Sequence, residues 1–277
     1  MKKLLLPAHY YQQFDADYGR RVPAEGFGGW KTARVELAPR HTALVVMHAW
    51  DCGGPDEYPG WRRAVECHPR ALRILKEVFP PLLAATRASP LPVLHVVGGG
   101  DYYRRLPGYR RARRLAGPAP SAPQAARDPV HRRLERFRAD HVFVGARNRP
   151  DVDAGFRKLD FAPEARPAQG EGVAEDGRQL GALCHEMGIN HLVYAGFAIN
   201  WCLLMSPGGM VDMRRQGFLC STIREAVTAV ENRETARTET EKRQALWRVS
   251  VEFGFVFGLE DFLAAVSRAG GPRKATR

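Results

Sequence analysis

The stretch His191-Leu-Val-Tyr-Ala-Gly-Phe-Ala-Ile-Asn-Trp-Cys202 decides the fold. Its apolar run Leu192–Ala195 predicts a buried strand of a parallel sheet, and Gly196 permits a tight turn before a helix that begins around Cys202. Free backbone N–H groups and the positive end of the helix dipole stabilise a thiolate at such a junction. The pattern therefore predicts a nucleophilic cysteine, although a small buried cysteine can also serve only to fill space.

Strands and helices are expected to alternate along the rest of the chain. The other predicted strands are Thr42–Ala49, Leu91–Val97, Gly217–Ser221 and Phe253–Phe257, with His141–Val144 as a short strand or as part of a connecting arm. The predicted helices are His68–Arg87 with a break or kink at Pro80-Pro81, Asp176–Met187, Arg233–Val249 and Glu260–Val266. This order predicts an α/β fold with three layers (α/β/α) around a mostly parallel, doubly wound sheet.

The chain length of 277 residues fits one large domain with additions. Residues 1–40 are rich in aromatic side chains and glycine and are expected to form an ordered N-terminal arm. Residues 41–268 form the domain itself, with an Arg-rich and partly helical insertion at about 101–140. Residues 269–277 are expected to be a disordered tail.

Composition limits the classes of function. The net charge of +12 invites a nucleic-acid interpretation, but no zinc-finger, helix-turn-helix or RNA-binding signature accompanies the Arg-rich stretches, so no specific nucleic-acid partner is expected. No apolar run is long enough to cross a membrane, and the apolar start of the chain is too short for a signal peptide. Five cysteines without a CxxC pair fit free thiols in a reducing compartment. The expected protein is cytoplasmic.

The turn that leads to Cys202 resembles that of a known family. Gly196, Phe197, Ala198, Ile199, Asn200, Trp201 and Cys202 are similar to the nucleophile turn of the isochorismatase-like cysteine hydrolases, roughly Gly-(Val/Phe)-Ala-Thr-Asn-x-Cys, with Ile199 in place of Thr. The likeness extends to His41–His48, Gly188–Val193 and Gly217–Val227, and covers about Thr42 to Leu263. It implies an isochorismatase-like fold.

The resemblance also implies a catalytic triad of Asp, Lys and Cys. Cys202 matches the cysteine, and Lys158 falls in the right part of the chain for the lysine. His48 stands where the family has its Asp, and Asp51 lies three residues further on. Two interpretations remain open at this point. Either His48 is the general base, with Asp51 to orient it or to line the mouth of the pocket, or His48 packs into a site that has lost catalysis.

The resemblance places substrate and oxyanion contacts at the turn itself. The residues are Ala198, Ile199, Asn200 and Trp201, and a cis peptide bond is implied at Ala198–Ile199. The helix after Cys202 is interrupted by Ser206-Pro-Gly-Gly209, because proline costs a helix ~3 kcal/mol and glycine ~1 kcal/mol. We expect the helix to restart near Met210 or at Pro207. The break either reshapes the pocket wall or is a surface insertion.

The predicted function is metal-independent hydrolysis of a small carbonyl substrate, most plausibly an amide, by the Cys202 thiolate. No cofactor is expected, because Gly98-Gly-Gly100 lacks the dinucleotide fingerprint, and no metal, because Asp101, His95 and His131 make no convincing ligand set. The resemblance implies a homo-oligomer. The alternative is a catalytically impaired member that binds a small ligand or a partner chain.

Overall fold

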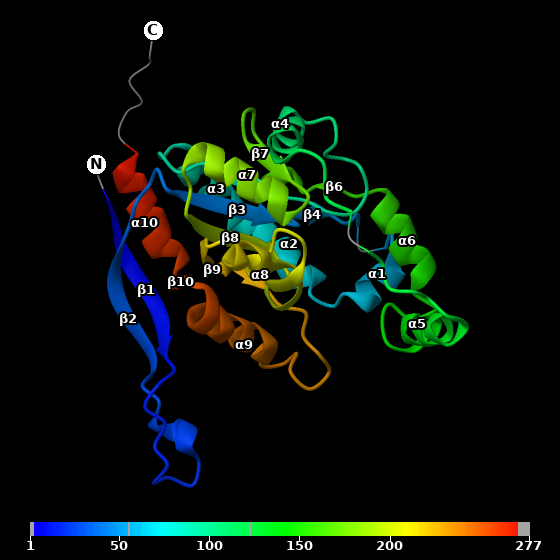
Figure 1. Ribbon diagram of the computed structural model, residues 1–277, viewed down its shortest axis with the longest axis horizontal. Coiled ribbons are helices and arrows are strands. Elements are labelled where there is room, and N and C mark those ends of the chain that lie inside the picture. Colours follow the sequence, from blue (N-terminus) through cyan, green and yellow to red (C-terminus); the bar gives the residue numbers. More distant parts are fainter. Residues whose placement is uncertain (1–2, 55, 122, 271–277) are drawn as a thin grey trace.

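The computed structural model describes residues 3–54, 56–121 and 123–270 and is built around one large sheet (Figure 1). The strand order is β2 (Gly29–Leu37), β1 (Leu4–Gln12), β10 (Val256–Phe257), β9 (Leu219–Thr228), β8 (His191–Phe197), β3 (Thr42–Met47), β5 (Val93–Val96) and β7 (Gly172–Ala174). The six strands from β10 to β7 are parallel, and the β1–β2 hairpin joins β10 antiparallel.

Helices cover both faces of this sheet, because successive side chains of a central strand point to opposite sides. From β3, Val45 and Met47 pack with α7 (Gly177–Met187), α8 (Met210–Arg215), α9 (Thr240–Arg248) and part of α4 (Pro107–Ala116). Leu44 and Val46 pack on the other face with α2 (His68–Glu77), α3 (Phe79–Arg87) and α10 (Leu259–Ala269). The predicted α/β/α fold class is confirmed.

Smaller elements complete the described part of the chain. They are β4 (Trp50–Asp51) paired with β6 (Asp160–Phe161), the helices α1 (Pro59–Ala64), α5 (Pro129–His141) and α6 (Arg149–Arg157), the 3-10 turns η1 (Pro23–Gly26) and η2 (Pro163–Ala165), and the π-helical turns η3 (Ile199–Leu203) and η4 (Val249–Phe253). None of the described helices combines the length and the apolar composition that crossing a membrane requires.

Most predicted elements are present with shifted ends. The helix expected over residues 68–87 is divided at Val78, so that Pro80 and Pro81 lie in the first turn of α3. The helix expected from Arg233 begins only at Thr240, because Asn232 accepts hydrogen bonds that hold the preceding residues in turns. Ala269, expected in the tail, is the last residue of α10. Residues 271–277 lie outside the described residues.

Of the two alternatives for His141–Val144, the short strand is wrong, and the segment is part of the connection that leads toward Lys158. The helix α5 extends to His141, and its carbonyl at Arg138 accepts hydrogen bonds from the N–H groups of Val142 and Phe143. These residues therefore close the helix and turn toward α6. Asp140 is held to Arg149 by an ion pair of 3.0 Å, which ties the end of α5 to the start of α6.

Within the predicted N-terminal arm, residues 4–37 form the β1–β2 hairpin at one edge of the sheet (Figure 1). Its strands pair over nine residues, from Leu4↔Leu37 to Gln12↔Gly29. Leu4 and Leu6 are buried in the core beside α10, while most of β2 is exposed. On the far half of β1, Tyr11 packs edge-to-face against Trp247 of α9 at 6.3 Å.

The centre of the sheet depends on one close approach of two backbones. Gly196 of β8 pairs with Met47 of β3, has φ +133°, and would place a Cβ 1.9 Å from the carbonyl oxygen of Met47. Only glycine permits this conformation and this contact together. The same position begins the turn that carries Cys202.

Replacing Gly196 with alanine should therefore destabilise the protein by more than about 4 kcal/mol, because both backbone strain and a steric clash result. The free energy of unfolding in urea measures it. Gly217→Ala is the matched control, since Gly217 has φ +92° with nothing within 4 Å of its added Cβ, and it should cost only about 1–2 kcal/mol. Equal losses in the two variants would contradict the role of the close approach.

Candidate active site

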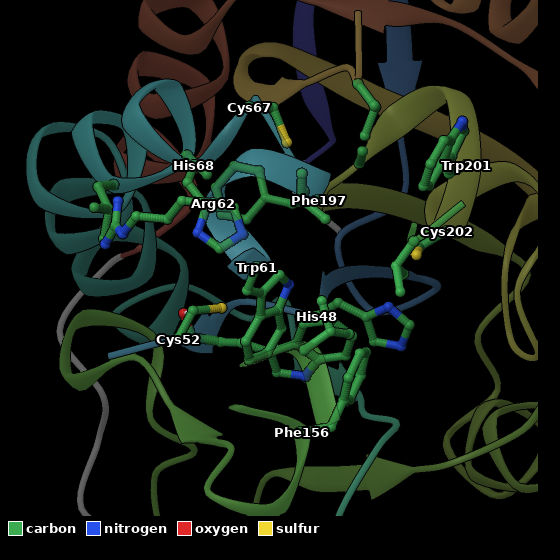
Figure 2. A pocket seen from close by; sticks show the side chains of 18 of the residues that line it. His48, Cys52, Trp61, Arg62, Cys67, His68, Phe156, Phe197, Trp201 and Cys202 are labelled. Carbon is green, nitrogen blue, oxygen red and sulfur yellow. The ribbon is translucent and has the colours of Figure 1, made fainter. Parts of the chain in front are cut away.

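A cavity of about 240 Å³ opens at the carboxyl ends of β3 and β8 (Figure 2). Open α/β sheets bind their ligands at this edge. Its wall is mostly apolar and aromatic, with contributions from Trp50, Trp61, Phe143, Phe156, Phe197 and Trp201. The polar side chains that line it are His48, His68, Arg62 and the thiols of Cys52, Cys67 and Cys202. Two residues singled out from the sequence, Cys202 and His48, therefore meet at one cavity.

Cys202 is half-buried and lies in the π-helical turn η3, directly after β8. The carbonyl of Ala198 accepts hydrogen bonds from the N–H groups of both Trp201 and Leu203, which winds this turn more widely than an α-helix. The side chain of Asn200 exchanges two hydrogen bonds with the backbone of Val230, of 2.8 and 2.9 Å. This pair anchors the turn to the segment that follows β9.

The helix break after Cys202 is a packed turn. Gly208 and Gly209 are buried, and the hydroxyl of Tyr194 donates to the carbonyl of Gly208 at 2.8 Å. A Cβ on Gly209 would lie 2.8 Å from the carbonyl oxygen of Cys202. The prediction that a helix restarts at Met210 is confirmed, and the interpretation of the break as a surface insertion is wrong.

His48 follows β3 and has a left-handed backbone, with φ +51°. Its N–H donates to the carbonyl of Val96 at 3.0 Å, and its ring stacks on Trp50 with centroids 4.4 Å apart. A Cβ on Gly98 would lie 3.1 Å from Nε2 of His48, so this glycine makes room for the imidazole. Only 8% of His48 is exposed, and its Nδ1 is buried without a hydrogen-bond partner.

The electrostatics of the cavity favour neutral side chains. Burial lowers the pKa of His48 to about 4, and the backbone of Val97 offsets only part of this effect. Burial also lowers the pKa of His68 to about 4, with a further contribution from the positive charge of Arg62. Burial raises the pKa of Cys52 and of Cys67 to about 12. At neutral pH these two imidazoles and two thiols are uncharged.

The structure does not bring Asp51 and Lys158 into the cavity wall. Asp51 is exposed and accepts a hydrogen bond from the N–H of Gly53, at 3.0 Å. The side chain of Lys158 is 71% exposed and its Nζ lies 3.9 Å from Glu57. Within the described residues, no Asp or Glu lines the cavity. The arrangement of thiol and imidazole therefore has no neighbouring carboxylate.

The residues predicted for substrate and oxyanion contacts divide into two pairs. Ala198 and Trp201 line the cavity. Ile199 is fully buried in the core, and the Asn200 side chain is engaged with Val230. The peptide bond in the cis form is Phe197–Ala198, so the prediction of Ala198–Ile199 is wrong by one residue.

The residues that form the cavity wall opposite β8 were not predicted from the sequence. Trp61 and Arg62 come from α1, and Cys67 and His68 from the start of α2. Loops and helix starts that follow the carboxyl end of a strand lie at this edge of an α/β sheet. This general rule could have predicted that the segment after the first strand contributes to the cavity. Trp61 also stacks on Phe156 of α6 at 4.9 Å, a contact that no local pattern predicts.

No cluster of three or more His, Cys, Asp or Glu side chains within the described ranges is placed to hold a metal ion. His95 is a core residue of β5, and its Nε2 lies 2.8 Å from Oε2 of Glu171. Arg87 donates two hydrogen bonds to the same carboxylate, of 2.7 and 3.0 Å. Burial would raise the pKa of Glu171, but the hydrogen bonds from His95 and Arg87 hold it at about 2. This group stabilises the structure outside the cavity.

Comparisons with known proteins place the chain beside several hydrolases. No protein-family profile and no curated protein matches the sequence. A cysteine hydrolase from Pseudomonas syringae pv. phaseolicola 1448A has a similar structure, with a TM-score of 0.47 and 13% identity over 84% of this chain and 95% of that one. An isochorismatase-like hydrolase from Alkaliphilus metalliredigens gives a TM-score of 0.45 and 15% identity over 81% and 97%.

The YcaC gene product of Escherichia coli, an octameric hydrolase of unknown specificity, gives a TM-score of 0.39 and 11% identity over 84% of this chain and 82% of that one. Of these three proteins, the one from Alkaliphilus metalliredigens carries the name of the family that the turn before Cys202 resembles in sequence. At such identities and TM-scores, function has to be inferred from the side chains of the cavity and not from these proteins.

The buried histidines predict a loss of stability in mild acid. Burial lowers the pKa of His48, His68 and His191 to about 4 in the folded protein, below the ordinary histidine value of 6.5. The unfolded chain therefore binds more protons between these values, so stability is full above pH 6.5 and falls as the pH drops toward 4. Each histidine contributes up to about 3 kcal/mol to this loss.

Urea midpoints at pH 7.5, 6.5, 5.5 and 4.5, at constant ionic strength, measure this effect. His191 lies outside the cavity, with Nε2 2.8 Å from Oγ of Ser221. A His191→Asn variant should therefore show a shallower fall than the wild type over the same range. A stability that stays constant down to pH 4.5 would show that these imidazoles are not buried as neutral groups.

The five cysteines should differ in their rate of alkylation at pH 7.5. Cys202 is half-buried and lines the cavity, whereas Cys184 and Cys220 are fully buried and burial raises the pKa of each to about 12. Iodoacetamide should modify Cys202 at least about tenfold faster than Cys184, because the thiolate is the reactive form and needs access. Peptide mass spectrometry over time measures each rate, and equal rates in the folded protein would contradict the prediction.

Proposed function

We propose that the chain is an isochorismatase-like cysteine hydrolase that attacks a small carbonyl compound, most plausibly an amide, with the thiolate of Cys202. One observation carries the proposal: Cys202, in the helical turn η3 that follows β8, lines the same apolar cavity as the neutral imidazole of His48. A thiol beside a base at a helix N-terminus is an arrangement that activates nucleophiles. The family resemblance of the turn supports the same assignment.

The cavity supports a sequence of proton transfers in which His48 serves as acid and base. The neutral imidazole accepts the proton of Cys202, and the thiolate forms a bond to the carbonyl carbon. Ile199 and Asn200 begin the turn η3, so their N–H groups have no acceptor within it and are candidates to hold the oxyanion. The imidazolium then returns its proton to the leaving amine, and water hydrolyses the thioester.

The low pKa of His48 fits this order of events. At neutral pH the imidazole is uncharged and can accept a proton, which is the form that a general base requires. A thiolate or oxyanion formed beside it would raise its pKa, because an opposite charge nearby stabilises the imidazolium. Proton transfer and charge formation at the sulfur therefore favour each other.

The alternative function is binding without catalysis. It is favoured by the absence of a carboxylate in the described lining of the cavity, and by the position of Lys158, whose exposed ammonium pairs with Glu57. Among the described residues, no carboxylate forms a hydrogen bond with Nδ1 of His48 to orient the ring. Under this alternative the cavity and its aromatic walls would still bind a small molecule, but Cys202 would not turn it over.

Substitution of Cys202 separates the two functions. Ammonia release from a panel of aryl and alkyl primary amides should fall at least about a thousandfold in Cys202→Ser, because the alcohol is a far weaker nucleophile. Cys184→Ala, in the core and outside the cavity, is the control and should keep the activity. Thermal unfolding of both variants verifies the fold. Turnover that is unchanged in Cys202→Ser would sink the hydrolase proposal.

His48 should affect the chemical step more than binding. In His48→Phe, which keeps an aromatic ring on Trp50, kcat should fall at least about a hundredfold with a smaller change in KM, because a general base contributes about that factor. Steady-state kinetics with the best amide of the panel provide both constants. A change confined to KM would assign His48 to binding alone. A cytoplasmic location and a homo-oligomer stay predictions, and light scattering tests the latter.

A further inference from the structure

His68 has no structural task that explains its position. Its side chain is the first of α2, only 8% of the residue is exposed, and it lines the cavity. Its ring meets Trp61 edge-to-face at 5.8 Å, but neither ring nitrogen has a hydrogen-bond partner within the described residues. Neither nitrogen is among the fully buried polar atoms that lack a partner in the described residues, so the imidazole is open to the cavity and can form a hydrogen bond to a ligand that displaces water there.

The position of His68 relative to the thiol of Cys202 indicates how a bound ligand would be oriented. Figure 2 shows Cys202 and the His48 ring on one side of the cavity, and His68 with Arg62 on the opposite side. A molecule whose carbonyl group is placed for attack by Cys202 would therefore present its far end to His68. The two ends of the cavity offer a reacting group and a recognition group.

The wall between these two ends is made of aromatic rings. Trp61 stacks on Phe156 at 4.9 Å, and Phe156 meets Trp50 edge-to-face at 6.0 Å. A volume of about 240 Å³ exceeds the roughly 150 Å³ of an apolar cavity that holds benzene. The space therefore suits one aromatic ring with a short substituent at each end, and aromatic walls favour a ring over an open chain.

The charges around the cavity favour a neutral ligand. Within the described lining there is no Asp or Glu that could pair with a cation. The guanidinium of Arg62 donates from Nε and Nη2 to the carbonyls of Gly54 and Gly53, at 3.3 and 3.2 Å. These bonds hold it to the loop, and Figure 2 shows it reaching away from Cys202. Burial and the charge of Arg62 keep the pKa of His68 at about 4, so its imidazole offers a hydrogen bond without a charge.

We propose that the substrate class of this site is a neutral aromatic amide with a hydroxyl or similar hydrogen-bonding group at the end opposite the amide, and that His68 is the residue that recognises this group. The inference rests on the proposed function in taking the cavity as the substrate site. It adds the shape and polarity of the substrate and a specificity-determining residue, neither of which follows from a thiol and an imidazole at the other end.

Binding measured apart from turnover tests the proposal. Isothermal titration of the wild type and of Cys202→Ala uses four probes: benzamide, 4-hydroxybenzamide, 4-carbamoylbenzoate and 4-(aminomethyl)benzamide. 4-Hydroxybenzamide should bind about five- to tenfold more tightly than benzamide, which is the range that one neutral hydrogen bond provides. The anionic and cationic probes should bind more weakly than benzamide.

Substitution of His68 assigns the preference to this residue. The ratio of the binding affinity for 4-hydroxybenzamide to that for benzamide should fall to about one in His68→Leu. In His68→Gln part of this preference should remain, because the glutamine amide can also form a hydrogen bond. His185→Leu is the matched control, because His185 is exposed on α7 outside the cavity, and it should leave the ratio unchanged. Thermal unfolding confirms the fold of each variant, and the affinity for benzamide itself verifies that the cavity is intact.

The outcomes separate this inference from the proposed function. Four results would each overturn recognition by His68. They are no increase in affinity from the hydroxyl group, an increase that remains in His68→Leu, tighter binding of a charged probe than of benzamide, and no binding of any probe. Hydrolysis of other amides by Cys202 alongside such a result would leave the hydrolase proposal in place. The predicted binding pattern without turnover of any amide would support His68 and reject catalysis.

Discussion

The arrangement of this protein depends on the contact between two backbones at the centre of the sheet. Gly196 lies against the carbonyl of Met47, where any side chain would clash. The pairing of β3 with β8 that includes this contact puts the ends of both strands at the same edge. His48 follows one strand and Cys202 follows the other after a short turn. A thiol and an imidazole separated by more than 150 residues in the sequence thus line one cavity because two strands pair closely.

Desolvation then sets the chemistry that this edge can support. The cavity wall is apolar and aromatic, so charge is costly there, and the imidazoles of His48 and His68 are held in their neutral forms. The ring of His48 lies on the side of the cavity where Cys202 lies, and His68 lies on the opposite side. In the proposed mechanism the first imidazole exchanges a proton with the thiol, and the second recognises the substrate through a hydrogen bond.

Comparison of the expected and observed elements shows where local sequence is sufficient. Leu192–Ala195 lies in β8 as predicted, since a short apolar run that ends at a glycine is typical of a parallel strand with both faces covered. The cap at Asp176 and the left-handed Gly188 mark both ends of α7 equally well. By contrast, the segment after Asn232 has helical periodicity but forms turns, and the helix α9 begins only after Glu239, whose backbone is left-handed with φ +47°.

The sequence by itself determined the α/β class and the position of Cys202 after a buried strand, because these depend on short patterns of polarity and glycine. Only the tertiary structure decided which side chains surround the thiol. Asp51 is near His48 in the chain, yet its carboxylate turns to the N–H of Gly53, whereas His68 enters the cavity wall from the start of another helix. The physical reason is that burial and side-chain direction result from the packing of elements distant in sequence, and no local pattern encodes them.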